Sequence, residues 1–330
     1  MEPVRWGLIG AGDICVKRVA PALRDSDLCE FVGVTRKQKD KAQSFADEFG
    51  AGKVYQDVDE MLADDDIEAV YISTPVNLHH TQTLAAAEAG KQVLCEKPMA
   101  LDAGKAEEMI GACRQYGVRL GIAYYRRFYP AVNRMMEIIE SGEIGRVILA
   151  EVLAFEYYQP SDEDPRWWFI DPEQSGGGPL IDFGSHRIDL FLYMLGKISE
   201  VTAFCDTLHH ERPTEDQATC LFRMKSGAQA ILSVSNAIGP PSDSLRILGT
   251  EGEIRAENLN SGEFVFHRNH EDETISLPNP ENTHQPLIED FCLAVREKRA
   301  PKIPGETGFE TTRIIGELYR SAKEGLVVKL

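Results

Sequence analysis

Asp182 and His186 are the two residues whose types and spacing most directly suggest proton transfer. They are four residues apart, so on a helical turn they share one face, and the carboxylate could orient or charge the imidazole. An imidazole titrates close to neutral pH, which suits a general acid or base. Taken singly, Asp182 is better explained as a helix cap and His186 as a satisfied surface or core histidine.

The stretch LIGAGDIC, from Leu8 to Cys15, has the form of a loop that binds a dinucleotide. Gly10 would allow a tight turn, and Gly12 would let the backbone approach a pyrophosphate at the N-terminus of the next helix. A strand is expected before this loop and a helix after it, as such a motif requires. Cys15 stands at the third glycine position, and we expect its larger side chain to set the helix slightly further from the strand.

The second expected strand ends in Thr35-Arg36-Lys37. Sites that prefer NAD usually place an acidic residue here, where it accepts hydrogen bonds from the ribose hydroxyls. A guanidinium can instead bind a 2′-phosphate through two hydrogen bonds and stack on adenine, so Arg36 favours NADP over NAD. The alternative is a solvated charge at a loop tip.

The elements that must position these residues are of two kinds. From Val4 to Tyr124, apolar runs of strand length alternate with helical patterns, which predicts a parallel sheet wound with helices. Gly50 and Gly90 lie where helices need a left-handed cap, and Pro21 should interrupt the first helix. The expected strands are residues 4–10, 31–36, 53–57, 69–74, 92–97 and 118–124.

After Pro130 the pattern changes to one helix, at 131–142, and then to strands that follow one another without helices between them. Such a run predicts an antiparallel or mixed sheet. A loop at 280–286 and helical periodicity from Gln285 to Lys323 complete the chain. The expected strands are residues 146–158, 200–208, 217–224, 227–237, 244–250, 252–257 and 263–268.

We therefore expect an α/β chain of two domains. Residues 1–124 should form a Rossmann domain with a doubly wound parallel sheet. Residues 125–330 should form an α+β domain for substrate binding and oligomerisation, with a largely antiparallel open sheet, and its C-terminal helices could pack back on the first domain. A length of 330 residues agrees with this division, since single cores seldom grow beyond about 250 residues.

Charge and cysteine content exclude several classes of partner. The formal charge of −18 repels phosphate backbones and anionic lipid, so neither nucleic acid nor a membrane is an expected partner. Seven scattered cysteines without a C-x-x-C pair indicate reduced thiols and a cytoplasmic location. The adjacent pairs His79-His80 and His209-His210 have diverging side chains, so no catalytic metal is expected.

Two further stretches carry a resemblance to a known family: STPVNLHHTQ (73–82) with CEKP (95–98), and GGGPLIDFGSHRID (176–189). Together with the glycine loop, they resemble the glucose-fructose oxidoreductase/inositol dehydrogenase family, also called Gfo/Idh/MocA. The resemblance covers essentially the whole chain, including YRRF at 125–128. It implies an NAD(P)-dependent dehydrogenase or reductase that acts on CH-OH groups.

The resemblance also implies roles for individual residues. In that family the lysine matching Lys97 lies by the nicotinamide, and the acid/base residues match Asp182 and His186. We expect His186 to be the general acid or base, Lys97 to stabilise the developing alkoxide, and Asp182 to orient the imidazole or bind a substrate hydroxyl. Which of Lys97 and His186 moves the proton stays open.

The other expected site residues form two groups by ligand. Without the resemblance, Lys97 would be a surface lysine, His79 and His80 a helix start, and Trp167 with Trp168 core residues. Expected at the cofactor are Gly10, Gly12, Asp13, Ile14, Arg36, Ser73, Thr74, Pro75, Asn77, His79, Glu96, Lys97 and Arg127. Expected at the substrate are Lys97, Tyr125, Trp168, Asp182 and His186.

The expected function is hydride transfer between NADP or NAD and a secondary alcohol or ketone of a sugar, cyclitol or related polyol. Relatives suggest an alternative, a glycosidase that uses tightly held NAD for transient oxidation. A cofactor-sensing regulator is a further alternative, but the presence of Lys97 and the Asp182–His186 pair argues against it, as does the lack of a DNA-binding helix pair. As in relatives, the sheet of the second domain should mediate a homodimer or homotetramer.

Overall fold

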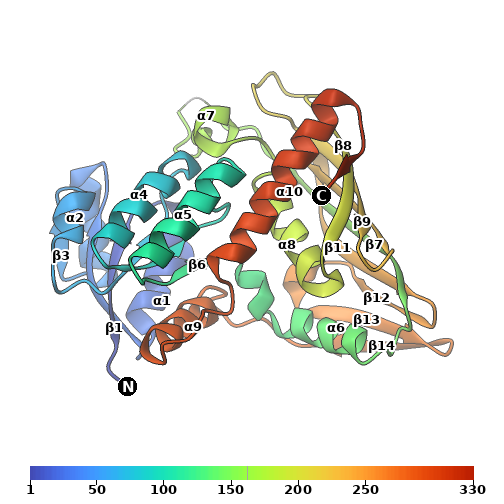
Figure 1. Ribbon diagram of the computed structural model, residues 1–330, viewed down its shortest axis with the longest axis horizontal. Helices are drawn as coiled ribbons and strands as arrows, with labels where there is room; N and C mark the ends of the chain where they lie inside the picture. Colours follow the sequence, from blue (N-terminus) through green and yellow to red (C-terminus); the bar gives the residue numbers. More distant parts are fainter. Residues whose placement is uncertain (162) are drawn as a thin grey trace. The chain divides into compact units, whose positions relative to one another are not determined.

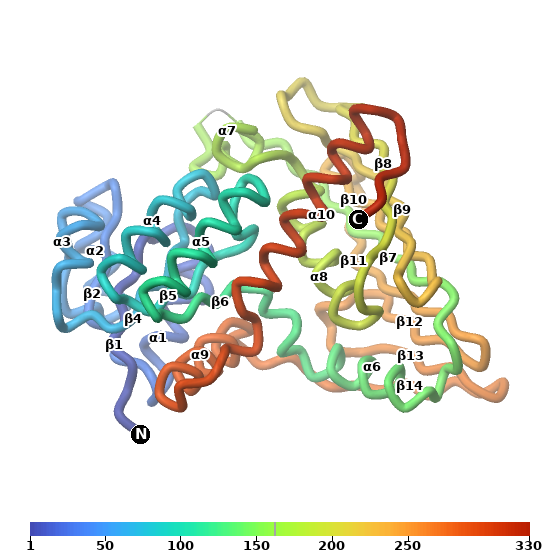
Figure 2. The backbone as a smooth tube through the Cα atoms, viewed as in Figure 1, coloured from blue at the N-terminus to red at the C-terminus, as the bar shows by residue number. Residues whose placement is uncertain are grey.

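The computed structural model describes residues 1–161 and 163–330, which pack into two compact units (Figures 1 and 2). The first unit contains Met1–Tyr125 and Glu281–Thr312, and the second contains Arg126–Pro280 and Arg313–Leu330. The segment 280–286, expected to be a simple connecting loop, thus holds the point where the chain returns to the first unit. Among the helices of residues 1–161 and 163–330, none combines the length and the apolar character that a membrane span requires.

A six-stranded sheet forms the centre of the first unit, in the order β3-β2-β1-β4-β5-β6. All its strand pairs are parallel, as predicted, and the direction of winding reverses between β1 and β4. Open α/β sheets bind ligands at such a reversal, beyond the carboxyl ends of the strands. The strands are β1 (Val4–Ile9), β2 (Cys29–Thr35), β3 (Lys53–Tyr55), β4 (Ala69–Ile72), β5 (Gln92–Cys95) and β6 (Leu120–Ile122).

Two helices of the first unit end at the glycines that the sequence marks. Gly50 and Gly90 have φ of 78° and 72°, the left-handed conformation expected after a helix. The first helix changes type near Pro21, because a π-helical turn (η1, Cys15–Val19) precedes α1 (Ala20–Asp25), whose first turn holds the proline. The others are α2 (Lys39–Phe49), α3 (Val58–Leu62), α4 (Val76–Glu88), α5 (Ala103–Gln115) and α9 (Gln285–Arg296).

The second unit contains a nine-stranded sheet in the order β14-β13-β12-β11-β7-β10-β9-β8-β15. Among the described strands of this sheet, β7 and β10 alone pair in parallel, so the predicted largely antiparallel sheet is confirmed. The sequence missed β14, whose side chains are nearly all exposed, and β15, which has two residues. The strands are β7 (Val147–Tyr157), β8 (Ile198–Asp206), β9 (Gln217–Met224), β10 (Gln229–Ser235), β11 (Ala237–Gly249), β12 (Gly252–Ala256), β13 (Glu263–Arg268), β14 (Glu271–Ser276) and β15 (Val328–Lys329).

Helices cover one face of this sheet (Figure 1). Along β7, Ala150, Val152 and Ala154 are buried under this cover, whereas Ile148 points the other way and is 45% exposed. The period-2 alternation is that of a sheet with one buried face. The helical elements are η2 (Tyr125–Phe128), α6 (Pro130–Glu140), η3 (Trp167–Ile170), α7 (Pro172–Ser175), α8 (Phe183–Leu195), η4 (Leu259–Ser261) and α10 (Gly305–Glu324), which begins in the first unit.

Candidate active site

The glycine turn after β1 is shaped for close approach by a ligand. Gly10 has φ of 91°, and a Cβ there would meet the main chain of Ser73 at 3.0 Å, so the turn requires glycine. At Gly12, the position of a missing Cβ has no described atom within 4 Å, apart from its chain neighbours. The turn therefore leaves open space at the place where a pyrophosphate would lie.

Cys15 packs beneath this turn. Its Sγ lies 2.7 Å from Ser73 Oγ, and it donates to the carbonyl of Gly10 over 3.5 Å. Burial raises the pKa of the thiol to about 12, so it stays protonated at neutral pH. The residue that replaces the third glycine thus joins the turn after β1 to the turn after β4.

Arg36 directly follows β2 and is half-buried. Burial, the largest influence, raises the pKa of Cys15. The Arg36 guanidinium lowers it, because a nearby positive charge favours the thiolate. The guanidinium is therefore near the glycine turn, at the end of the strand where an adenosine ribose is expected.

The turn from β4 to α4 contributes a buried acceptor that lacks a protein partner. Oδ1 of Asn77 is buried and has no hydrogen-bond partner among the described residues. Since most buried polar groups are paired, this atom is available to a bound molecule. Next to it, Thr74 Oγ1 donates to Gln82 Oε1 over 2.6 Å, which holds the turn in place.

His79 faces the protein interior. Its Nε2 lies 2.8 Å from the carbonyl oxygen of Thr74, and its Nδ1 lies 3.0 Å from that of Pro98. Burial lowers its pKa, and a neutral ring donates to only one of these oxygens. We expected His79 at the cofactor, but its two nitrogens join the turn after β4 to the turn after β5.

Glu96 also points inward, whereas Lys97 follows it at the edge of the sheet. Tyr71 Oη donates to Glu96 Oε1 over 2.7 Å, and the Lys97 amide donates to Oε2 over 3.1 Å. Both carboxylate oxygens are thus used within the protein, although Glu96 was expected at the cofactor. Lys97 is half-buried and directly precedes the buried Pro98.

In the second unit, Asp182 and His186 lie at the start of α8. Asp182 holds the N-cap position, but its side chain makes no capping hydrogen bond, so helix capping does not account for its carboxylate. His186 lies one turn later and is only 4% exposed. Their spacing places them on one side of the helix, as the sequence predicts.

The glycine run before α8 is required by close packing. A Cβ at Gly177 would collide with the hydroxyl of Tyr319, and one at Gly178 with the carbonyl oxygen of Glu215. The Glu215 carboxylate accepts hydrogen bonds from the amides of Gly178 (2.9 Å) and Leu180 (3.2 Å) and from Tyr319 Oη (2.9 Å). These contacts hold the segment that leads into the Asp182–His186 turn.

Three other expected residues have these surroundings. Arg127 pairs with Asp189 of α8 within the second unit, with Nη2 2.7 Å from Oδ1, and this contact occupies much of its guanidinium. The ring of Trp168 stacks on Phe169, with a centroid distance of 4.0 Å. Tyr125 belongs to the first unit.

Apart from His79 and Arg127, the expected cofactor residues follow strands of the first unit at one edge of its sheet. They follow β1 (Gly10, Gly12, Asp13, Ile14), β2 (Arg36), β4 (Ser73, Thr74, Pro75, Asn77) and β5 (Glu96, Lys97). Supporting residues that the sequence did not reveal are Tyr71 and His284 in the first unit, and Glu215 and Tyr319 in the second. No motif marks them, because their partners lie far away along the chain. Nowhere in residues 1–161 and 163–330 do three His, Cys, Asp or Glu side chains lie close enough to share a metal ion.

Comparison with known proteins identifies the family. Residues 4–124 match the oxidoreductase family with an NAD-binding Rossmann fold, and residues 132–255 match the GFO/IDH/MocA C-terminal domain. The chain is 32% identical to the 1,5-anhydro-D-fructose reductase of Ensifer adhaerens over 309 residues, which are 92% of either protein. It is 29% identical to D-xylose 1-dehydrogenase (NADP(+)) 2 of Haloferax volcanii over 98% of this chain and 99% of that protein.

A solved structure extends the likeness to three dimensions. The WlbA dehydrogenase from Bordetella pertussis, in complex with NADH and UDP-GlcNAcA, matches with a TM-score of 0.89 and 26% identity, over 100% of this chain and 99% of that one. The doubly wound sheet and these matches define an NAD(P)-dependent oxidoreductase. The chain belongs to the GFO/IDH/MocA family. The resemblance inferred from the motifs is therefore confirmed.

Proposed function

We propose that this chain transfers a hydride between the nicotinamide of NADP or NAD and a secondary alcohol or ketone of a sugar, cyclitol or related polyol. The observation that carries the proposal is the set of groups at one edge of the parallel sheet. The open turn at Gly12 follows β1, the buried Asn77 Oδ1 without a hydrogen-bond partner follows β4, and Lys97 follows β5. The activities named for two relatives, a 1,5-anhydro-D-fructose reductase and a D-xylose 1-dehydrogenase, support the substrate class.

The residues at this edge fit a nicotinamide dinucleotide. The Gly10–Gly12 turn leaves room for a pyrophosphate at the start of a helical segment, whose free amides favour an anion. Asn77 Oδ1 would accept a hydrogen bond from the bound molecule. When bound, the cofactor supplies or accepts the hydride.

Side chains of the protein would transfer the hydroxyl proton of the substrate and stabilise the negative charge on its oxygen. An alcohol must lose its hydroxyl proton as it is oxidised, and its own pKa lies far above neutral. We assign this proton to His186, with Asp182 orienting the imidazole. Lys97, as an ammonium, would stabilise the negative charge that develops on the oxygen.

The proposed preference is for NADP. Arg36 lies at the carboxyl end of β2, near the glycine turn, and offers a planar, permanently charged group for a 2′-phosphate. The Haloferax relative, which is named as an NADP(+) enzyme, supports this choice of cofactor.

The proposal is tested first by fluorescence titration with NADPH and NADH. A panel of sugars and cyclitols is then screened by the absorbance of the reduced nicotinamide. With the substrate so found, Lys97→Ala and His186→Ala should each lower turnover about 100- to 10,000-fold while the Kd for NADPH changes little. Lys105→Ala, at an exposed lysine paired with Asp102, is the matched control and should behave as wild type. Near-normal turnover in Lys97→Ala or His186→Ala would remove the assigned role.

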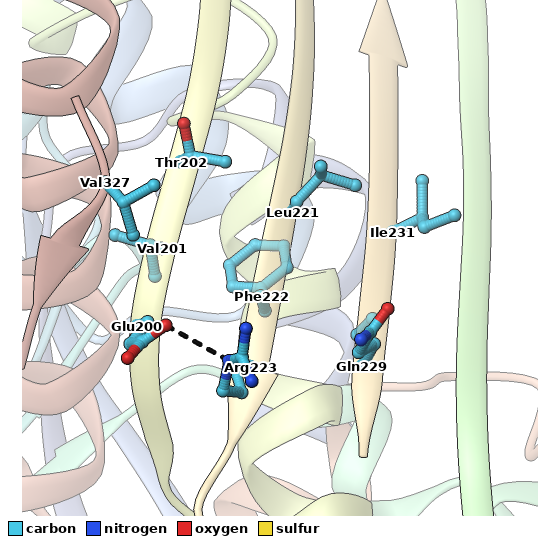
Figure 3. A pocket seen from close by; sticks show the side chains of 10 residues that line it. Glu200, Val201, Thr202, Leu221, Phe222, Arg223, Gln229, Ile231 and Val327 are labelled. Carbon is cyan, nitrogen blue, oxygen red and sulfur yellow. Dashed lines mark ion pairs between the residues drawn. The ribbon is translucent and has the colours of Figure 1, made fainter. Parts of the chain in front are cut away.

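We also propose that copies of this chain associate through the outer face of the nine-stranded sheet. Large apolar side chains are exposed on it, including Phe204 (77%) and Leu221 (49%). A shallow groove crosses β8, β9 and β10 beside Leu221 and Ile231, and the ion pair between Glu200 and Arg223, at 3.0 Å, lies along it (Figure 3). Because charges of both signs occur there, a second copy could pack on this face without strong repulsion, in a two-fold arrangement that uses the same patch twice.

Sedimentation velocity at micromolar concentration tests this assembly. The wild type should sediment as a dimer or tetramer, and Leu221→Glu should shift it toward monomer by burying a charge in the interface. Tyr116→Glu, at an exposed aromatic of the first unit, should leave the assembly unchanged. A monomeric wild type would contradict the proposal.

A further inference from the structure

His284 is a buried imidazole that the proposed chemistry does not use. It directly precedes α9, in the segment that returns to the first unit, and is 1% exposed. Its amide donates to Asn282 Oδ1 over 3.0 Å, and its carbonyl accepts from the amide of Ile288 over 3.0 Å. The start of the helix therefore determines where the ring points.

The ring of His284 contacts two turns at the functional edge of the sheet. Its Nε2 lies 3.5 Å from Glu96 Oε1, and its centroid lies 4.4 Å from that of Tyr125. Glu96 immediately precedes Lys97 after β5, and Tyr125 follows β6, the neighbouring strand. One side chain from the C-terminal segment thus joins the ends of two adjacent strands.

Glu96 needs this neighbour because its carboxylate is buried. Burial by itself raises the pKa of Glu96, but His284, the Tyr71 hydroxyl and the Lys97 charge together lower it below its usual value. An ionised carboxylate in the interior is costly unless surrounding groups compensate its charge. Its second oxygen holds the amide of Lys97, so a change in the position of Glu96 reaches the lysine directly.

No hydrogen bond within the described residues competes with the contact between the imidazole and Glu96. Within the described residues, neither of its nitrogens has a hydrogen-bond partner at normal distance. One edge of the ring makes a polar contact with Glu96, and the ring also packs against that of Tyr125. The two interactions can be separated by substitution, because phenylalanine keeps an aromatic ring and removes the polar edge.

We propose that His284 is a positioning residue, which holds the Glu96 carboxylate and the Tyr125 ring and thereby sets the place of Lys97 at the edge of the sheet. This inference rests on the proposed function, since it assumes that Lys97 acts on the substrate oxygen. His284 itself touches neither cofactor nor substrate in this role.

The experiment compares His284→Phe, Glu96→Gln and the double variant with the wild type, using the substrate found in the panel. His284→Phe should lower kcat about tenfold, because displacement of a catalytic group by about 1 Å costs up to about 100-fold. The Kd for NADPH should stay within about twofold, since the glycine turn is untouched. The double variant should lose little more than either single variant, because both act through one contact.

The matched control is His80→Phe, which removes another imidazole–carboxylate contact of the first unit, 2.7 Å from Glu108 of α5. It should leave kcat unchanged. His284→Gln, which keeps a polar donor, should recover most of the activity. An unchanged kcat in His284→Phe, losses that add in the double variant, or equal losses of kcat and NADPH affinity would each overturn the inference.

The outcome for Lys97→Ala separates this inference from the proposed function. If Lys97→Ala keeps normal turnover, the proposed function fails. If Lys97→Ala is inactive and His284→Phe matches wild type, only the positioning role fails. Should His284→Phe not fold, Glu96→Gln and His284→Gln provide the test. The positioning role then requires a lowered kcat in Glu96→Gln and a kcat close to that of the wild type in His284→Gln. Any other pattern counts against the role.

Discussion

Arg127 and Asp189 form a buried ion pair in the second unit. Nη2 of Arg127 lies 2.7 Å from Oδ1 of Asp189, and Nε lies 3.0 Å from Oδ2. Asp189 follows His186 by three residues on α8, so the pair anchors the helix that carries the proposed acid or base. Burial raises the pKa of Asp189, and Arg127 opposes the shift.

The first prediction concerns this pair. Asp189→Asn keeps the shape of the side chain but removes the charge that faces the guanidinium, which should lower the free energy of unfolding by about 3 kcal/mol. Urea denaturation followed by circular dichroism measures it. Glu137→Gln, which breaks an exposed pair with Arg134, is the control and should cost less than about 1 kcal/mol. Equal effects in the two variants would show that the buried pair contributes no more than a surface pair.

Arg36→Asp should move cofactor preference toward NAD. The guanidinium would lose its contacts with a 2′-phosphate, and the new carboxylate would repel that phosphate and accept the ribose hydroxyls. Charge-assisted hydrogen bonds contribute about 1.5–3 kcal/mol, so the ratio of NADPH to NADH affinity should fall at least about tenfold. Lys37→Asp makes the same charge change at the next, exposed residue. If both variants shift the ratio of NADPH to NADH affinity equally, the shift comes from the change in local charge and not from binding of the 2′-phosphate by Arg36.

Asp243 should make the second unit sensitive to acid. Its carboxylate accepts from Arg187 Nη2 (2.6 Å), Arg126 Nη1 (3.0 Å) and Asn260 Nδ2 (2.9 Å). Burial alone would raise its pKa, but Arg187 and Arg126 outweigh burial and lower it. A carboxylate with a lowered folded-state pKa stabilises the fold above its unfolded pKa of about 3.9, and this contribution disappears as the pH falls through the folded-state pKa.

The matching variant is Asp243→Asn. At pH about 7 it should be less stable than wild type by about 3 kcal/mol, because two buried guanidinium groups lose their shared counter-charge. The difference should shrink as the pH falls below about 4, because the unfolded wild type binds the proton first and the folded wild type loses the same charge at still lower pH. Urea denaturation at a series of pH values measures both quantities, and a difference that does not depend on pH would exclude the ionised carboxylate as its source.

Cys29 and Cys292 should form an internal disulfide when the protein is treated with diamide. Their sulfur atoms are 3.6 Å apart, although the residues are 263 positions apart along the chain, and a small side-chain rotation would bring them to bonding distance. Each thiol gives up one hydrogen to the reagent, which is reduced. Mass spectrometry of the unreduced peptides should find the 29–292 link, and Cys29→Ser should abolish it. Recovery of only other disulfides would contradict the prediction.

Sequence patterns sufficed for much of the fold because they are local. Alternating strands and helices predicted the parallel sheet, and Gly50 and Gly90 marked helix ends, since both signals come from neighbouring residues. The expected strand 92–97 ends at Lys97, so the sequence placed the lysine at the carboxyl edge of the sheet. By contrast, β14 has almost no apolar residues, so no hydrophobic pattern could reveal it.

The sequence by itself determined which chemical groups this protein carries and which element each one follows, because strand and helix periodicity depends on adjacent residues. Only the tertiary structure decided which other residues those groups contact. It turned Glu96 and His79 inward, paired Arg127 with Asp189, and brought His284 to Glu96 and Cys292 to Cys29. Such contacts join segments far apart in the chain, and they depend on how helices and strands pack.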